Sequence, residues 1–146
     1  MARFTHIIVG TDFSASAERA VDLAVEMAQQ FGAALTLVHV TEVPVFAYGS
    51  VGVVTGDLIT PIREAAEQAT ATALAALQQR LPAAKSVVRL GFAADEVLAA
   101  AQELGADLIV TGTHGRRGMT HLLLGSVAEK IVRMSPVPVL TVRTPE

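Results

Sequence analysis

Short runs of β-branched and other apolar residues alternate with longer segments of helical period along the whole chain. Each short run is followed by enough chain for a helix, which is the pattern of repeated strand–helix–strand units. Successive strands joined in this way lie parallel, with right-handed crossovers that place helices against the sheet. The pattern therefore predicts an α/β fold with a three-layer, open, parallel five-stranded sheet. Its expected strands are residues 6–9, 35–40, 87–90, 108–111 and 137–143.

Four segments carry the period of an amphipathic helix. The apolar face of the first reads Ala20, Ala24, Met27, Ala28 and Phe31. Ser14 or Ser16 is expected to cap the start of this helix, and Gly32 to end it. Asp95 is expected to begin the third helix and Gly105 to close it. The second helix is expected to span Ile62 to Leu77, and the fourth Val127 to Met134.

Length and composition narrow the class of protein further. The 146 residues suit one domain, and no internal repeat or linker appears, so we expect a single domain over residues 1–146. Hydrophobic residues make up 51% and aromatic residues 4%, which suits helices packed on an aliphatic sheet. A net charge of −3 without a basic run argues against nucleic acid as a partner. No apolar stretch reaches the ~18 residues of a membrane span, and no signal peptide is evident, so we expect a cytoplasmic protein.

A glycine constellation follows the fourth expected strand. Gly112, Gly115, Gly125 and Ser126 are spaced as Gly-x2-Gly-x9-Gly-Ser, and a helix follows them. Glycines allow the backbone to approach a ligand closely, and a helix N-terminus offers unpaired N–H groups to a phosphate. In an open parallel sheet, ligands sit at the carboxyl ends of strands where the strand order reverses. The spacing indicates a phosphate site, although glycines also serve simply as turns and helix caps.

Asp12 lies directly after the first expected strand, in the segment Val-Gly-Thr-Asp-Phe-Ser. A carboxylate there can accept hydrogen bonds from a ribose hydroxyl or an adenine amino group. Position alone equally allows it to cap the following helix. If the first and fourth strands are neighbours, Asp12 and Gly112 flank one crevice.

With the Thr-Asp-Phe-Ser turn, the His39-Val40 strand end and the glycine loop, the chain resembles the ATP-binding branch of the universal stress protein family. The resemblance covers the whole length and implies strand order 3-2-1-4-5, the adenine nucleotide alpha hydrolase-like fold. It also implies that the ligand is ATP, bound with magnesium. One departure is Gly10, where proline is common in relatives.

The resemblance also assigns residues to the two ends of the nucleotide. Asp12 and the backbone of Val40 would hold the adenosine end. The ribose and phosphates would be cradled by Gly112, Gly115, Gly125, Ser126 and the backbone of Val127.

Several catalytic signatures are absent from the sequence. It has neither a Gly-Lys-[Ser/Thr] P-loop, nor a Gly-x-Gly, nor a His-Glu-x-x-His. Without a phosphate-clamping Lys or metal carboxylates, the chain is poorly equipped for fast phosphoryl transfer. We therefore expect a nucleotide-dependent regulatory or stress-response protein acting on an unknown protein partner. Two alternatives stay open: a slow ATPase or self-phosphorylating enzyme using Ser126, Thr120 or Thr113, and a nucleotide-free interaction scaffold.

Charged and imidazole side chains surround the same loop. Arg116 and Arg117 either neutralise the phosphates or form a solvated face. His114 and His121 are expected to be solvated, and His39 to be a hydrogen-bonded packing residue.

The last strand predicts self-association. Its segment Val-Pro-Val-Leu-Thr-Val contains Pro138, which cannot donate to a ladder and so favours a sheet edge. An exposed edge rich in Val and Leu is a liability that pairing with a second copy would remove. The resemblance points the same way, to a homodimer through the C-terminal strand. The long Gly-containing connection over residues 41–56 is left without an expected conformation.

Overall fold

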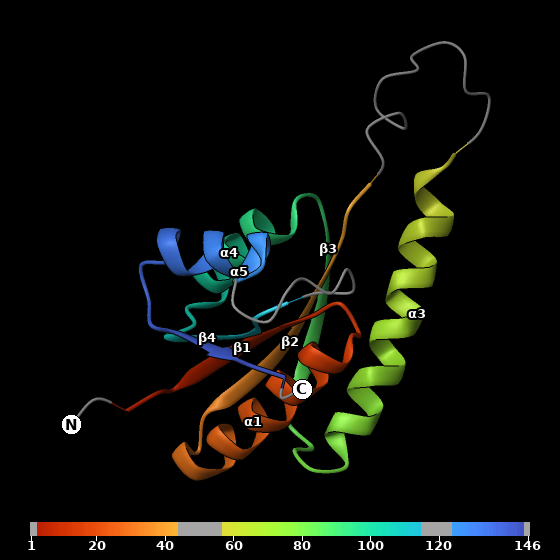
Figure 1. Cartoon of the computed structure of the whole chain (residues 1–146). Coiled ribbons are helices and arrows are strands. Elements are labelled where there is room, and N and C mark those ends of the chain that lie inside the picture. The colour runs from red at the N-terminus through yellow and green to blue at the C-terminus, as the bar shows by residue number, and fades with distance from the viewer. Residues whose placement is uncertain (1–2, 44–56, 115–123, 145–146) are drawn as a thin grey trace.

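The computed structural model describes residues 3–43, 57–114 and 124–144. Within them, five strands form one sheet of order β3-β2-β1-β4-β5, and every neighbouring pair is parallel (Figure 1). The parallel pairing and the order 3-2-1-4-5 confirm the predicted fold. The strands are β1 (His6–Thr11), β2 (Ala34–Thr41), β3 (Lys85–Leu90), β4 (Leu108–Gly112) and β5 (Val139–Val142).

Helices cover both faces of the sheet and complete the three layers. They are α1 (Ala15–Phe31), α3 (Ile59–Gln78), α4 (Ala93–Leu104) and α5 (Ser126–Met134). Successive side chains of a strand point to opposite faces, so Ile7 and Val9 of β1 pack against α1 while Ile8 packs against α4 and α5. The two resulting cores are aliphatic and share the strands between them.

β1 and β4 lie at the centre of the sheet. Ile7 pairs with Leu108 and Val9 with Val110, and Ile7, Val9 and Val110 are fully buried. The apolar run of β4 is thus covered on both faces, as its sequence predicts. This arrangement brings the carboxyl ends of the two strands side by side.

The helix boundaries follow from local chemistry. The Ser14 hydroxyl accepts a hydrogen bond from the Ala17 N–H at 3.2 Å and caps α1, so of the two candidate caps Ser14 serves. Gly32 and Gly105 end their helices in the left-handed conformation, as predicted. The expected start of α4 at Asp95 is wrong by two residues. Ala93 begins this helix, and Asp95 lies in its first turn, where a carboxylate favours the positive end of the helix dipole.

The part of the connection 41–56 beyond residue 43 lies outside the described residues. Among the helices that the structure does describe, none combines the length and apolar character that crossing a bilayer requires.

Candidate functional site

The chain leaves β1 and β4 in opposite directions at their carboxyl ends. After β1 it enters α1 on one face of the sheet, and after β4 it reaches α5 on the other face. The order β2-β1-β4-β5 reverses between these two neighbouring strands. This is the topological switch point, where open α/β sheets bind their ligands. Asp12 and Gly112 flank it, as the sequence predicts.

Asp12 is fixed in a tight turn between β1 and α1. Its Oδ1 accepts the Ser14 N–H at 2.9 Å, and the Thr11 hydroxyl accepts the Phe13 N–H at 3.0 Å. Phe13 has a φ of 65°, a left-handed conformation that a bulky residue rarely adopts. Since Ser14 is the helix cap, capping does not explain Asp12. The turn instead orients its carboxylate at the end of the central strand.

His39 forms the neighbouring part of this edge. Its Nδ1 lies 2.8 Å from the Thr11 carbonyl oxygen, which can only accept, so Nδ1 carries a proton. Its Nε2 lies 3.1 Å from the Thr41 hydroxyl, and its ring lies 4.5 Å from that of Phe13. His39 is therefore the hydrogen-bonded packing residue that the sequence predicts. It holds the end of β2, including Val40, against the Asp12 turn.

Gly112 has a structural reason to be glycine that the sequence does not reveal. A Cβ at this position would lie 2.5 Å from the Ser16 Oγ and 3.1 Å from the Ser16 carbonyl oxygen. The close approach is thus between the end of β4 and the first turn of α1. Gly10, in contrast, has room for a side chain, because its nearest neighbour would be Val97 Cγ2 at 3.7 Å.

Gly125 closes the loop that follows β4. Its N–H donates to the Thr113 carbonyl oxygen at 2.7 Å, and a Cβ there would lie 2.8 Å from that oxygen. The two ends of the glycine loop therefore meet, and α5 begins at Ser126 beside the end of β4. Gly115, like Arg116, Arg117, Thr120 and His121, lies outside the described residues.

The start of α5 is available to an anion. Its cap residue is Gly125, which has no side chain to accept a hydrogen bond from the N–H groups of the first turn. Ser126 and Val127 are exposed as its first two residues. The unpaired N–H groups and the positive dipole end of such a helix attract phosphate.

Two buried polar atoms beside Gly112 have no hydrogen-bond partner within the described part of the chain. One is the Ser16 hydroxyl, on a residue only 8% exposed, and the other is Nε2 of His114. Nδ1 of His114 lies 3.1 Å from the Thr113 hydroxyl. Buried polar groups are normally paired, so these two atoms are candidates to bond a ligand at this edge of the sheet. Of the two serines proposed as caps, Ser14 is the cap and Ser16 is buried instead. The expectation that His114 is solvated is wrong for its Nε2 atom, which is buried.

Metal-binding side chains do not gather in the parts of the chain that the structure describes. Within residues 3–43, 57–114 and 124–144, no three His, Cys, Asp or Glu side chains are placed to hold an ion. The described site is built from backbone, hydroxyl and imidazole groups and a single carboxylate.

The profile of the universal stress protein family matches residues 3–143 of this sequence. The chain belongs to the universal stress protein family. The universal stress protein A homolog 1 of Coxiella burnetii is 33% identical over 145 residues, covering 95% of this chain and 96% of that protein. The family resemblance read from the sequence is therefore confirmed.

Solved universal stress proteins share the fold. The UspA structure from Lactobacillus plantarum is 27% identical, with a TM-score of 0.74, and the match covers 98% of this chain and 100% of that one. A universal stress protein in complex with cAMP is also 27% identical, with a TM-score of 0.65 and coverage of 97% and 98%. The sheet has the strand order of the adenine nucleotide alpha hydrolase-like fold that these relatives represent.

Proposed function

We propose that this universal stress protein is a cytoplasmic, single-domain regulatory protein that binds ATP in the crevice between β1 and β4. The observation that carries the proposal is that Asp12 and the exposed start of α5 lie at the carboxyl ends of two neighbouring strands, at the switch point. A relative that binds cAMP supports an adenine nucleotide as the ligand class. ATP is the form with the phosphates that an exposed helix N-terminus favours.

The proposed roles follow the length of the nucleotide. Asp12 and the backbone of Val40 bind the adenosine end, where the turn and His39 fix the carboxylate and the strand end. Gly112, Gly115, Gly125, Ser126 and the backbone of Val127 surround the ribose and phosphates.

Ser16 and His114 add polar atoms beside Gly112 that a bound ligand can satisfy. Magnesium, if bound, is held mainly by the phosphates, as is usual for nucleotide-bound Mg²⁺.

Nucleotide occupancy would change the conformation or the protein partner. The site supports binding better than turnover, because the described residues around it offer no Lys clamp on the phosphates. We further propose that the protein is a homodimer joined through β5, which is an edge strand of the sheet.

Slow self-phosphorylation at Thr113 is a second candidate function. The Thr113 hydroxyl lies 3.1 Å from Nδ1 of His114, which is within reach for proton transfer. The hydroxyl oxygen would attack the γ-phosphorus of ATP, its proton would pass to His114, and ADP would leave. Incubation with ATP followed by mass spectrometry tests this role. A phosphate on wild type but not on a folded Thr113→Val variant supports it, and an unmodified wild type excludes it.

The nucleotide itself can be identified directly. We expect the purified protein, once boiled, to release an adenine nucleotide that chromatography resolves from guanine nucleotides. Protein stripped of nucleotide should then bind ATP, and fail to bind GTP, in calorimetry. Equal binding of ATP and GTP would contradict the role of Asp12 in reading adenosine.

A further inference from the structure

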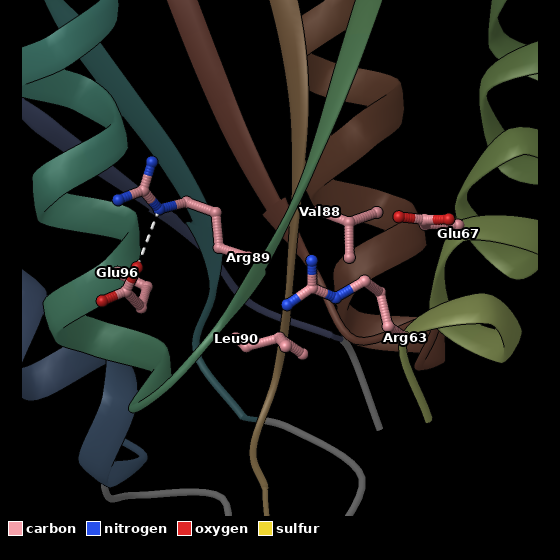
Figure 2. Close-up of a pocket in the computed structure, with 6 residues that line it drawn as sticks. All are labelled: Arg63, Glu67, Val88, Arg89, Leu90 and Glu96. Carbon is pink, nitrogen blue, oxygen red and sulfur yellow. Dashed lines mark hydrogen bonds and ion pairs between the residues drawn. The ribbon is translucent and has the colours of Figure 1, made fainter. Parts of the chain in front are cut away.

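A hollow of about 340 Å³ lies over the outer edge of β3, two strands away from β1. Figure 2 shows its lining, which is formed by Arg63 and Glu67 of α3, Glu96 of α4, and Val88, Arg89 and Leu90 of β3. α3 and α4 pack on opposite faces of the sheet, so a hollow lined by both must cross the edge of the strand. Its volume is in the range of known ligand pockets.

The backbone of β3 offers hydrogen bonds to this hollow. The Gly91 N–H donates to the Thr41 carbonyl oxygen at 3.1 Å, which turns the main-chain groups of Gly91 toward β2. Main-chain groups alternate along a strand, so Val88 and Leu90 direct their N–H and C=O groups outward. Neither has a further backbone partner among the described residues. Such an edge is a template for another strand.

The charged side chains on the two walls of the hollow differ in whether they already form ion pairs. Arg89 is already engaged, because it bonds Glu96 at 2.9 Å and Glu103 at 2.7 Å on α4. Arg63 and Glu67, on the opposite wall, form no ion pair within the described part of the chain. In Figure 2 both side chains extend from α3 toward β3, with Glu67 beside Val88 and Arg63 between Val88 and Leu90. The hydrogen bond from Thr60 lowers the pKa of Asp57 at the start of α3, and the charge of Arg63 helps to lower it. This wall therefore presents a cation and an anion that have no ion-pair partner among the described residues.

The spacing of these two charges matches an extended peptide. Residues four apart on a helix are separated by about 6 Å along its axis. Residues two apart on a strand lie on the same face and are separated by about 6.7 Å. We propose that this edge of β3 docks an extended segment of a partner protein that carries an acidic residue two positions before a basic one. The segment adds a sixth strand to the sheet, with its acid at Arg63 and its base at Glu67.

The order of the charges follows from the direction of the added strand. β3 runs from Lys85 to Leu90, and Figure 2 shows Arg63 near Leu90 and Glu67 beside Val88. An added strand that is antiparallel to β3 runs from Leu90 toward Val88, so it passes Arg63 before Glu67. Antiparallel pairs are two- to threefold more common than parallel ones. An antiparallel segment therefore reads acid-x-base, and a parallel segment would read base-x-acid.

A charge-swap experiment on the full chain tests the proposal. The probes are two fluorescent peptides, Thr-Val-Thr-Glu-Val-Lys-Thr-Val-Thr and the same peptide with Glu and Lys exchanged. Wild type should bind the Glu-x-Lys peptide more tightly in fluorescence anisotropy, by roughly two- to fivefold per exposed ion pair. The Arg63→Glu/Glu67→Arg variant should prefer the exchanged peptide. Both substituted residues are exposed, so the fold should persist.

Three outcomes would overturn the proposal. The first is that wild type binds neither peptide saturably, and the second is that wild type binds both peptides equally. The third is that the Arg63→Glu/Glu67→Arg variant keeps the peptide preference of wild type. A wild-type preference for the exchanged peptide would overturn the antiparallel direction. Light scattering on wild type and on a separate Arg63→Glu variant distinguishes a second copy: if Arg63→Glu dissociated an oligomer, the edge would bind a second copy instead of a partner protein.

A proline pair tests the backbone part independently. Val88→Pro removes an outward N–H inside the hollow without touching a bond to β2, so peptide binding should fall at least fivefold. Ser86→Pro removes an outward N–H of the same strand outside the hollow, opposite the end of the peptide, and should weaken binding less than Val88→Pro. Circular dichroism checks that both variants are folded. Equal affinity of the Val88→Pro variant and wild type would contradict strand addition.

Discussion

The turn after β1 contains a strained backbone conformation at Phe13, next to the place where the ligand is proposed to bind. Phe13 is held at a φ of 65°, a conformation that costs an ordinary residue roughly 1–2 kcal/mol. Hydrogen bonds from the Phe13 and Ser14 N–H groups and the contact with His39 maintain it. Strain that persists in this way is typical of functional sites. The orientation of Asp12 is the feature that it secures.

Asp12→Ala should weaken nucleotide binding by roughly 1.5–3 kcal/mol, because it removes a charge-assisted hydrogen bond. Calorimetry should show the loss with both ATP and adenosine. Ser14→Ala is the matched control two residues away. It removes the cap of α1, which costs about 1 kcal/mol of unfolding free energy, and should keep its nucleotide affinity. Unchanged affinities of Asp12→Ala for both ligands would exclude Asp12 from the site.

Asp107 joins the starts of β1 and β4 at the opposite end of the sheet. Burial raises the pKa of its carboxyl, but the hydrogen bonds from Thr5 and His6 outweigh burial and leave the pKa lowered. A lowered pKa stabilises the fold above the pKa of the unfolded chain, and that stability is lost as the pH falls.

Asp107→Asn should therefore lower the free energy of unfolding by about 1 kcal/mol at pH 7. The gap to wild type should narrow below about pH 4, where the carboxyl first becomes protonated in the unfolded chain and then, at lower pH, in the native protein. Urea titrations of both proteins at pH 7, 5 and 3 measure this difference in the free energy of unfolding. A gap that stays constant over this range would show that the charge of Asp107 does not matter.

Individual elements were predictable to different degrees. The alternation of strand and helix periods placed the five strands and four helices that the structure describes, and Gly32 and Gly105 marked two helix ends. The start of α4 was missed because its cap, Phe92, makes no side-chain hydrogen bond to the first turn and so leaves no signal in the sequence. The contact of Gly112 with Ser16 and the isolation of the Ser16 hydroxyl depend on how α1 crosses β4. Neither can be derived from spacing along the chain.

Gly112→Ala should destabilise the protein by roughly 1–3 kcal/mol, because its Cβ would collide with Ser16 of α1, including its backbone. Gly10→Ala, at the corresponding end of the neighbouring strand, meets only an ordinary contact and should be neutral or slightly stabilising. Chemical denaturation of both variants provides the comparison. If the two substitutions had equal effects, the close packing of α1 on β4 would be refuted.

At the scale of the whole molecule, the sheet leaves two edges, β3 and β5. On β5, Pro138 and Val142 direct their carbonyl groups to β4, so the alternation places the main-chain groups of Val139 and Thr141 on the outer side. The sequence predicted the edge position from Pro138, and the strand order confirms it. The pairing of this edge with a second copy stays a prediction.

We expect light scattering at micromolar concentration to show a dimer. Val139→Pro should make it monomeric, because it removes an outward donor from β5 while sparing the bonds to β4. A monomeric wild type would exclude the dimer. A folded, dimeric Val139→Pro variant would place the interface elsewhere.

The most direct test of the proposed crevice is calorimetry of ATP with magnesium on wild type and Gly115→Val. A side chain at Gly115 would occupy the space in which the loop backbone is proposed to approach phosphate, so the variant should lose measurable binding. Wild type should bind one nucleotide per chain, and adenosine should bind wild type and Gly115→Val with similar affinity. Wild-type affinity for ATP in a folded Gly115→Val variant would contradict the assignment of phosphate to this loop.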